Sequence, residues 1–276
     1  MRKLVLALAA MPLLLAAGAV PSSAAAASAR VRLVYLSPDN ALGDVDFYID
    51  GRKALNKTVY DTESTYLTVA PGQHTFDVRK AGAAPASVPD ATVQQSLAAG
   101  YWSVFVGGKV GSSTCPIKAV IFSDDFATPP AGKVVARFVH MAPEVPGVDV
   151  ILNDASNTVL FKNVSCFQGS SYSTFPTGSY PVALVATGQT SPQLFQTQAN
   201  LSRAGVVYTL VGAGGVDEPV SLVSILDAAS AGSAPQGAAA TGGGGTALGG
   251  MLPLVVIAGS LLACALLLLF VRRTAP

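Results

Sequence analysis

The sequence predicts an all-β protein made of two tandem antiparallel β-sandwich domains, of the Ig-like or Greek-key type, followed by a C-terminal transmembrane helix. Three observations support this prediction. The same succession of short motifs occurs twice at a spacing of about 105 residues, which is too long for one unit of a solenoid and typical of a domain pair. The segments inside each copy alternate apolar and polar residues. One long uncharged segment lies near the C-terminus.

The start of the chain has the features of a secretory signal. A short basic segment precedes an apolar run from Leu4 to Val20, and the small residues of PSSAAAASA follow. A basic region, an apolar core and small residues at the cleavage site define such a signal. We therefore expect residues 1–27 to be removed on export. The alternative is an uncleaved membrane anchor.

Residues 251–271 form an uncharged apolar segment that predicts a membrane-spanning helix. At about 1.5 Å per residue, a helix of this length crosses a hydrocarbon core about 30 Å thick. Arg272 and Arg273 follow directly, and basic residues stay in the cytoplasm. We therefore expect residues 272–276 inside the cell and the rest of the chain outside. The Gly- and Ala-rich stretch 229–250 is expected to be a flexible linker.

The order of features at this end resembles the cell-wall sorting signals that sortases read in Gram-positive bacteria. Thr241 and Gly242 precede the apolar segment and the basic tail, although the Leu-Pro or Leu-Ala that usually leads the signal is missing. The resemblance implies covalent attachment to the wall through a sortase. Plain anchoring in the membrane is the alternative, and both place the protein at the cell surface.

The two copies align over nearly their whole length and predict one domain at residues 30–127 and another at residues 133–228. In the first copy, YLTVAPGQHTFDV corresponds to YSTFPTGSYPVAL in the second, LAAGYWSVFVGG corresponds to LSRAGVVYTLVGAGG, and AVIFSDD corresponds to LVSILDA. The segment VDFYID has the period of two that predicts a strand with one buried face. Asp50-Gly51 then predicts a hairpin turn. Pro71-Gly72, between TYLTV and HTFDV, predicts a hairpin with a type II turn.

These motifs resemble the bacterial family called domain of unknown function 4397. The resemblance rests on the opening ARVRLVYLSPDN…VDFYIDG, on its second form ARFVHMAPEVPGVDVILND, and on PGQHTFDV. It covers most of the region between the two terminal segments. The second copy departs from the pattern at the turn, where Asn153-Asp154 replaces Asp-Gly. The resemblance implies tandem β-sandwiches in a secreted or surface-anchored protein, and it implies no catalytic residues.

Charge and cysteine usage narrow the classes of function. The two terminal segments hold four of the 17 basic residues, which leaves 13 basic against 16 acidic residues between them. No basic surface is concentrated enough to bind nucleic acid, so we expect no such partner. The chain has no CxxC motif and no Cys/His cluster, and we expect no cofactor.

Cys115 and Cys166 are the candidate disulfide, because disulfides persist outside the cell. They fall in different copies at non-equivalent positions, so a bond between them would join the two copies. Two free thiols are the alternative.

Charged residues that recur in both copies are the first candidates for a site, because a site essential to each domain should appear twice. The recurring pairs are Arg32/Arg137, Asp46/Asp149, Asp39/Glu144 and Asp124/Asp227. We interpret Arg32, Arg137, Asp46 and Asp149 as structural charges that pair across a sheet or hold a loop in place.

Acidic residues gather near the start of the first copy. Asp39, Asp44 and Asp46, together with Asn40, offer the oxygen ligands that calcium prefers, so a calcium site in the first copy is an alternative to the structural interpretation. Asp44 and Asp46 are also the residues that an envelope hydrolase would use, provided that a cleft holds two carboxylates at a working distance.

Aromatic residues are richer in the first copy. Tyr101 and Trp102 align with Val206 and Val207, and one of two adjacent strand residues must face outward. An exposed aromatic side chain can stack on a sugar or on a protein partner. The alternative is that it covers a junction between domains.

The sequence as a whole predicts a non-catalytic cell-surface protein with a binding, adhesive or structural role in the envelope of a Gram-positive bacterium, actinobacterial by its Ala- and Gly-rich character. The expected partners are the membrane, a sortase, and an extracellular protein or glycan. The alternatives are an envelope hydrolase and an accessory or sensor subunit of a membrane protein.

Overall fold

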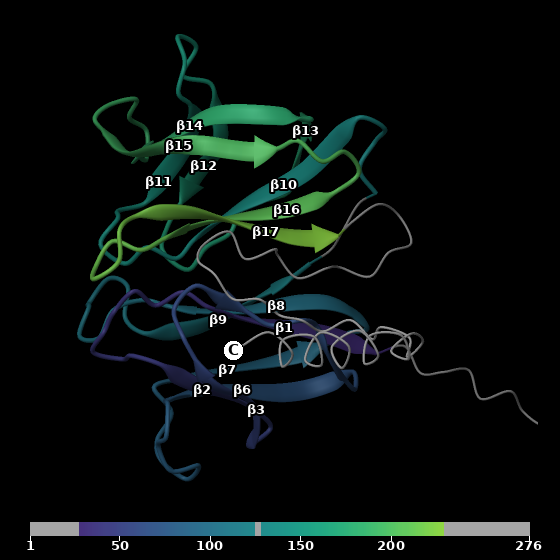
Figure 1. The fold of residues 1–276 in the computed structure, drawn as a ribbon, viewed down its shortest axis with the longest axis vertical. Helices are drawn as coiled ribbons and strands as arrows, with labels where there is room; N and C mark the ends of the chain where they lie inside the picture. Colours follow the sequence, from purple (N-terminus) through teal and green to yellow (C-terminus); the bar gives the residue numbers. More distant parts are fainter. Residues whose placement is uncertain (1–27, 125–127, 229–276) are drawn as a thin grey trace, which may run out of the picture. The chain divides into compact units, whose positions relative to one another are not determined.

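The computed structural model describes residues 28–124 and 128–228 (Figure 1). Every regular element in these residues is a β-strand, and the strands form four sheets. The prediction of an all-β chain with two tandem β-domains is therefore confirmed. We call residues 28–124 the first repeat and residues 128–228 the second repeat.

The predicted signal, linker, membrane helix and cytoplasmic tail lie outside the described residues. Among the residues that are described, no helix is long and apolar enough to cross a membrane.

Each repeat consists of two sheets with the same strand order. In the first repeat one sheet has the order β3-β2-β6-β7, and the other has the order β4-β1-β8-β9 with β5 also paired to β1. The bounds are β1 Ala29–Tyr35, β2 Val45–Ile49, β3 Arg52–Thr58, β4 Thr62–Glu63, β5 Leu67–Val69, β6 Gly72–Lys80, β7 Ala91–Leu97, β8 Gly100–Gly107 and β9 Lys118–Ser123.

The second repeat has the same plan, with sheets β12-β11-β14-β15 and β13-β10-β16-β17. Its strands are β10 Lys133–His140, β11 Val148–Leu152, β12 Val159–Val164, β13 Ser173–Pro176, β14 Gly178–Ala186, β15 Gln193–Leu201, β16 Val207–Ala213 and β17 Ser221–Ala228. The internal repetition of the sequence thus corresponds to a repetition of topology.

The expectation of purely antiparallel sheets is wrong at one place in each repeat. Strand β1 runs parallel to β8, and β10 runs parallel to β16. Strands β4 and β5 pair with one edge of β1 in antiparallel fashion, and β8 pairs with its other edge after the chain has built the second sheet from β2, β3, β6 and β7. Alternation of apolar and polar residues has the same period in both arrangements and does not distinguish them.

The two predicted turns have different outcomes. Asp50 and Gly51 both have left-handed φ angles, 51° and 75°, and connect β2 to β3 as the hairpin signal predicts. The Pro71-Gly72 hairpin is wrong, because β5 pairs with β1 whereas β6 pairs with β2. The chain therefore crosses from one sheet to the other at Gly72, whose φ is 138°.

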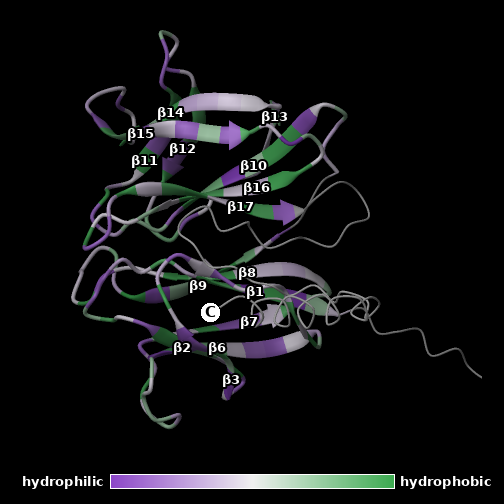
Figure 2. Cartoon of the chain, in the orientation of Figure 1, coloured by the Kyte–Doolittle hydropathy of each residue, from purple (hydrophilic) through white to green (hydrophobic). Residues whose placement is uncertain are grey.

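Each repeat has its own apolar core between its two sheets. In the first repeat Val31 and Val104 meet Phe47 and Phe76, and all four side chains are buried. An equivalent cluster in the second repeat includes Phe138. Figure 2 shows the apolar residues along β16, one of the strands that supply this interior.

A third apolar cluster joins the two repeats. It contains Val34 and Phe105 from the first repeat with Val139, Val211 and Ile225 from the second. Strands such as β1, from Val31 onward, and β16 are consequently buried on both faces. Both repeats belong to one compact unit of the chain.

His74 links the start of β6 to the hairpin turn of β2 and β3. Its Nδ1 lies 2.7 Å from Asp50 Oδ2, and its Nε2 lies 2.7 Å from the Ala70 carbonyl oxygen. Both partners are acceptors, so an imidazole that donates to both carries two protons. Burial by itself would lower the pKa of His74, but the hydrogen bonds to Ala70 and Asp50 outweigh it and raise the pKa.

We predict that this contact stabilises the fold only at low pH. Because the folded-state pKa of His74 lies above the unfolded value of about 6.5, its contribution is complete below that pH and is lost as pH rises through the raised pKa. The Tm difference between the wild type and His74→Gln should therefore be larger near pH 5.5 than near pH 8.5. A difference independent of pH would contradict the assignment. His140 is present in both proteins, so its effect on the pH dependence of Tm cancels in the difference between them.

Candidate functional site

The most concentrated group of charged side chains in the described residues lies between the repeats. Arg32, on β1, is fully buried. Its Nε and Nη2 donate to Ser103 Oγ at 3.0 and 2.7 Å, and Nη2 also donates to Asp227 Oδ1 at 2.6 Å. Its Nη1 donates to the Leu226 carbonyl oxygen at 3.4 Å. Arg32 thus binds a hydroxyl of its own repeat and a carboxylate of the other.

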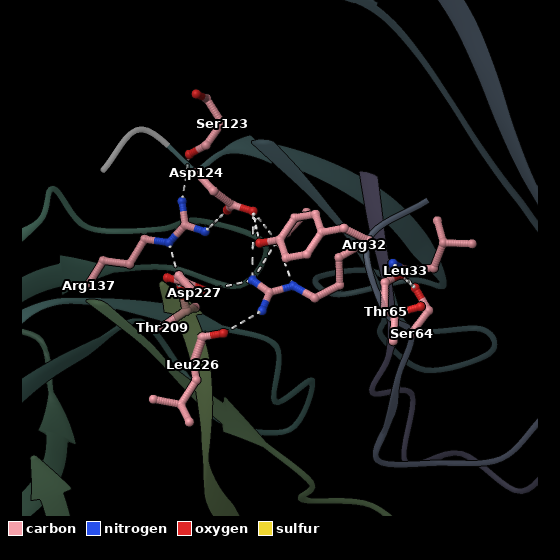
Figure 3. Close-up of polar contacts among 12 residues, drawn as sticks. Arg32, Leu33, Ser64, Thr65, Ser123, Asp124, Arg137, Thr209, Leu226 and Asp227 are labelled. Carbon is pink, nitrogen blue, oxygen red and sulfur yellow. Dashed lines mark hydrogen bonds and ion pairs between the residues drawn. The ribbon is translucent and has the colours of Figure 1, made fainter. Parts of the chain in front are cut away.

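Arg137 repeats this pattern in the opposite direction. It lies on β10 and donates from Nε to Thr209 Oγ1 at 2.9 Å. Its Nη1 donates to the Ser123 carbonyl oxygen at 2.9 Å, and its Nη2 is paired with Asp124 Oδ1. Figure 3 shows the two guanidinium groups and the two carboxylates pointing toward one another.

The two carboxylates are bound in equivalent ways. Asp124 Oδ2 accepts hydrogen bonds from Ser103 Oγ at 2.7 Å and from Tyr66 Oη at 2.8 Å. Asp227 Oδ2 accepts from Thr209 Oγ1 at 2.5 Å and from Tyr172 Oη at 3.2 Å. The repeats therefore exchange their arginine–aspartate pairs, and the contacts of one repeat are reproduced by the other.

The network holds two positive and two negative groups in a buried site. Burial by itself would lower the pKa of Arg32, but the charges of Asp227 and Asp124 outweigh it and raise the pKa. Burial raises the pKa values of Tyr66 and Tyr172, so both phenols stay protonated and donate. Burial also raises the pKa of Asp227, against the opposing charge of Arg32.

Aromatic rings cover both guanidinium groups. The Cζ atom of Arg32 lies 5.1 Å from the centroid of the Tyr66 ring, and that of Arg137 lies 4.8 Å from the centroid of the Tyr172 ring. A cation over an aromatic face is attracted to the negative side of the ring quadrupole. Each tyrosine therefore contacts the arginine of its own repeat and donates to the aspartate of its own repeat.

A family comparison accounts for both repeats. The model of DUF4397, a domain of unknown function, matches residues 29–151 and 136–240. The chain belongs to the DUF4397 family. The two matches fall on the two repeats, so the resemblance inferred from the motifs is confirmed. A search of curated proteins finds no match.

A disulfide lies at the edge of the junction between the DUF4397 repeats. The structure joins Cys115 and Cys166, whose Cα atoms are 6.2 Å apart. An exposed ion pair between Lys109 and Glu144, at 2.5 Å, also crosses the junction. The covalent bond and the polar network therefore connect the same two repeats.

Asp46 binds the backbone of its own repeat. Its Oδ1 accepts from the Lys57 amide at 2.8 Å, and its Oδ2 accepts from Lys53 Nζ at 2.6 Å and from the Gly82 amide at 3.3 Å. Burial by itself would raise the pKa of Asp46, but these hydrogen bonds outweigh it and lower the pKa. The side chain fixes the irregularity of β3 at Lys57, whose φ of 50° is left-handed.

Asp149 has the same role in the second repeat. Its two oxygens accept from the backbone amides of Asn163 at 2.6 Å and Gly188 at 2.9 Å. Asn163 has a left-handed φ of 53°, as Lys57 does in the first repeat. Each repeat therefore uses one buried aspartate to hold an irregular strand position and a loop.

The candidate calcium ligands are only partly brought together. Asp39 and Asp44 line a small cavity of about 50 Å³ with Tyr60 and Glu218, and Asp46 is not part of its lining. Both oxygens of Asp39 accept backbone hydrogen bonds, from the amides of Ala41 and Val110. No group of three or more His, Cys, Asp or Glu residues in the described part of the chain is arranged to hold a metal ion.

The aromatic candidates lie at the start of β8. Trp102 is half-buried, packs against the core of the first repeat and donates from Nε1 to the Ala98 carbonyl oxygen at 3.0 Å. Tyr101 packs edge-on against Tyr66 with a centroid distance of 5.1 Å. A cleft of about 520 Å³ borders both side chains and the loop before them.

The alignment of Trp102 with Val207 is wrong by one residue. Strand register places Trp102 opposite Val31 and places Tyr208 opposite Ala136, the counterpart of Val31. Trp102 therefore corresponds to Tyr208, and the second repeat keeps an aromatic side chain there. The cause is a longer turn before β16 than before β8. The candidate sorting residues Thr241 and Gly242 lie outside the described residues.

Sequence reasoning missed several members of the network and the exchange between repeats. Ser103 and Thr209 are small hydroxyl residues in aligned strands, and Tyr66 and Tyr172 begin aligned segments. The occurrence of hydroxyl residues and tyrosines in aligned segments of both copies is the sequence pattern that could have identified these members of the network. An alignment of two repeats does not say whether an arginine binds the aspartate of its own copy or of the other.

We predict that neutralising one buried carboxylate costs much more stability than neutralising an exposed one at the same junction. Asp227→Asn removes the nearer of the two carboxylates beside the buried Arg32, leaves only Asp124 at 3.7 Å, and should lower the free energy of unfolding by about 3–5 kcal/mol. Glu144→Gln is the matched control, because its pair with Lys109 is exposed and contributes about 0–1 kcal/mol. Denaturant unfolding of the purified chain measures both. Equal losses would contradict the role assigned to the network.

Proposed function

We propose that this DUF4397 protein is a non-catalytic component of a Gram-positive cell surface, with two repeats that act as one rigid unit in a binding, adhesive or structural role. One observation carries the proposal. In the described residues, the aspartates and arginines that recur at equivalent positions bind each other across the junction or bind backbone amides of their own repeat.

The recurring charged groups are already bound to other groups of the protein. A general base or nucleophile needs a lone pair directed at a substrate, and a general acid needs a pKa near the working pH. The carboxylates of Asp124 and Asp227 are buried and bound by hydroxyl and guanidinium groups. Repetition has therefore preserved contacts that hold the fold together.

The cell-surface location rests on three features that agree with one another. The sequence has a secretory signal at one end and an apolar segment with two arginines at the other. The disulfide between Cys115 and Cys166 fits an oxidising compartment outside the cytoplasm. Membrane anchoring and sortase-dependent wall attachment at Thr241 and Gly242 both fit this location.

The alternatives have weaker support. A hydrolase that uses Asp44 and Asp46 would need both carboxylates free, whereas Asp46 is held by Lys53 and by two backbone amides. An accessory or sensor subunit would use the same rigid unit and would co-purify with a membrane protein in fixed stoichiometry. An extracellular protein or glycan is the partner class that the cleft beside Tyr101 and Trp102 fits best.

We predict opposite accessibility for tags at two places in the full chain. An epitope inserted beside Val88, which is 88% exposed, should bind antibody on intact cells. An epitope after Pro276 should bind only after the cells are permeabilised. The reverse result, or release of the whole chain into the medium, would contradict surface anchoring. Extraction by detergent alone or only after wall digestion separates the two modes of attachment.

A further inference from the structure

The junction face of each repeat carries both halves of the contact that joins the repeats. We define the junction face of the first repeat by Arg32, Asp124 and the apolar residues beside them, and that of the second repeat by Arg137, Asp227 and their apolar neighbours. Each face contributes one arginine and one aspartate, and these contact the aspartate and the arginine of the opposite face. A contact in which two surfaces present the same groups to each other is isologous, and such a surface is complementary to itself.

We propose that the junction face is a self-association surface that also fits the same face of a second copy of this chain. In a pair of first repeats, Arg32 of each copy meets Asp124 of the other. In a pair of second repeats, Arg137 meets Asp227. Two chains therefore pair through like repeats once the pairing within each chain is broken and the bond between Cys115 and Cys166 is absent. This inference does not depend on the cellular location proposed above.

The apolar part of the face supports like pairing. Strand register and the repeated motifs make five positions of the joining cluster equivalent, and every one is apolar in both repeats: Val34 and Val139, Leu36 and Met141, Phe105 and Val211, Val120 and Val223, and Phe122 and Ile225. A pair of like repeats therefore buries apolar surface against apolar surface around the polar network. In a pair of like repeats, every buried charge of the network also lies beside an opposite charge.

Three features make the pairing of unlike repeats the preferred one. Cys166 corresponds to Tyr60 in the first repeat, because each lies six residues before an equivalent tyrosine of the network. The disulfide therefore forms only when the first repeat meets the second. A Cβ added at Gly169 would lie 3.1 Å from the Phe122 ring, so glycine lets the second repeat approach the first closely at this place. The short connection between the repeats also raises the effective concentration of one repeat near the other.

Charge reversal in one repeat tests the proposal. The parent chain carries Cys115→Ser and Cys166→Ser, so that no disulfide joins its repeats. Adding Arg137→Asp and Asp227→Arg reverses the charges of the second repeat. Every charged contact between unlike repeats then has like charges, whereas contacts between like repeats keep opposite charges. Light scattering after gel filtration of the full chain in detergent should give twice the protein mass of the parent chain. Reversing Arg32→Asp and Asp124→Arg as well restores the pairing within one chain and should return the monomer. A folded monomer with only the second repeat reversed would overturn the proposal.

Disulfide trapping tests the same proposal without altering the buried charges. Its result does not depend on whether the charge-reversed chain folds. Tyr60→Cys with Cys166→Ser removes the partner of Cys115 within the chain and provides one in the first repeat of another copy. In a thiol–disulfide buffer the full chain should form a disulfide-linked dimer on a non-reducing gel. Tyr60→Ser with Cys166→Ser is the matched control, because it keeps Cys115 and Cys264 and should stay monomeric. Equal dimer in both chains, or in neither, would overturn the inference.

Discussion

The reciprocal exchange of arginine–aspartate pairs between the repeats is the interaction on which the rest of the structure depends. A buried guanidinium is stable only beside an opposite charge, and the carboxylate nearest to Arg32 and to Arg137 belongs to the other repeat. Neither repeat can bury its own arginine and aspartate in this way without a partner. The strands β1, β8, β10 and β16 are buried on both faces for the same reason, because one face packs against the core and the other carries the apolar and polar contacts of the junction.

This constraint shapes what the protein can do. The polar residues that recur in both repeats are used to join the repeats or to hold irregular strand positions such as Lys57 and Asn163. Differences between the repeats are therefore the better place to look for recognition of a partner, and Tyr101, which corresponds to Val207, is one such difference beside the cleft.

Much of the fold could be predicted from the sequence, because alternation of apolar residues and turn dipeptides are local signals. The repeats, the all-β class and the Asp50-Gly51 hairpin follow from them. The parallel pairing of β1 with β8 and the crossing at Pro71-Gly72 depend on which distant strand becomes a neighbour, and local patterns do not contain that information. The same limit applies to Arg32: its recurrence was visible, but its partner Asp227 lies 195 residues away in the other repeat.

The central claim is that the two repeats form one cooperative unit, and the single tryptophan allows a direct measurement. Trp102 lies in the first repeat, so its fluorescence follows the unfolding of that repeat, whereas far-UV circular dichroism follows both. Phe138→Ala weakens the core of the second repeat by about 3–5 kcal/mol. Reductant breaks the disulfide, so that only the noncovalent junction couples the repeats. We then expect a single unfolding transition in Phe138→Ala, with its midpoint lowered equally by fluorescence and by circular dichroism. A fluorescence transition that stays in place while the circular dichroism separates into two steps would contradict it.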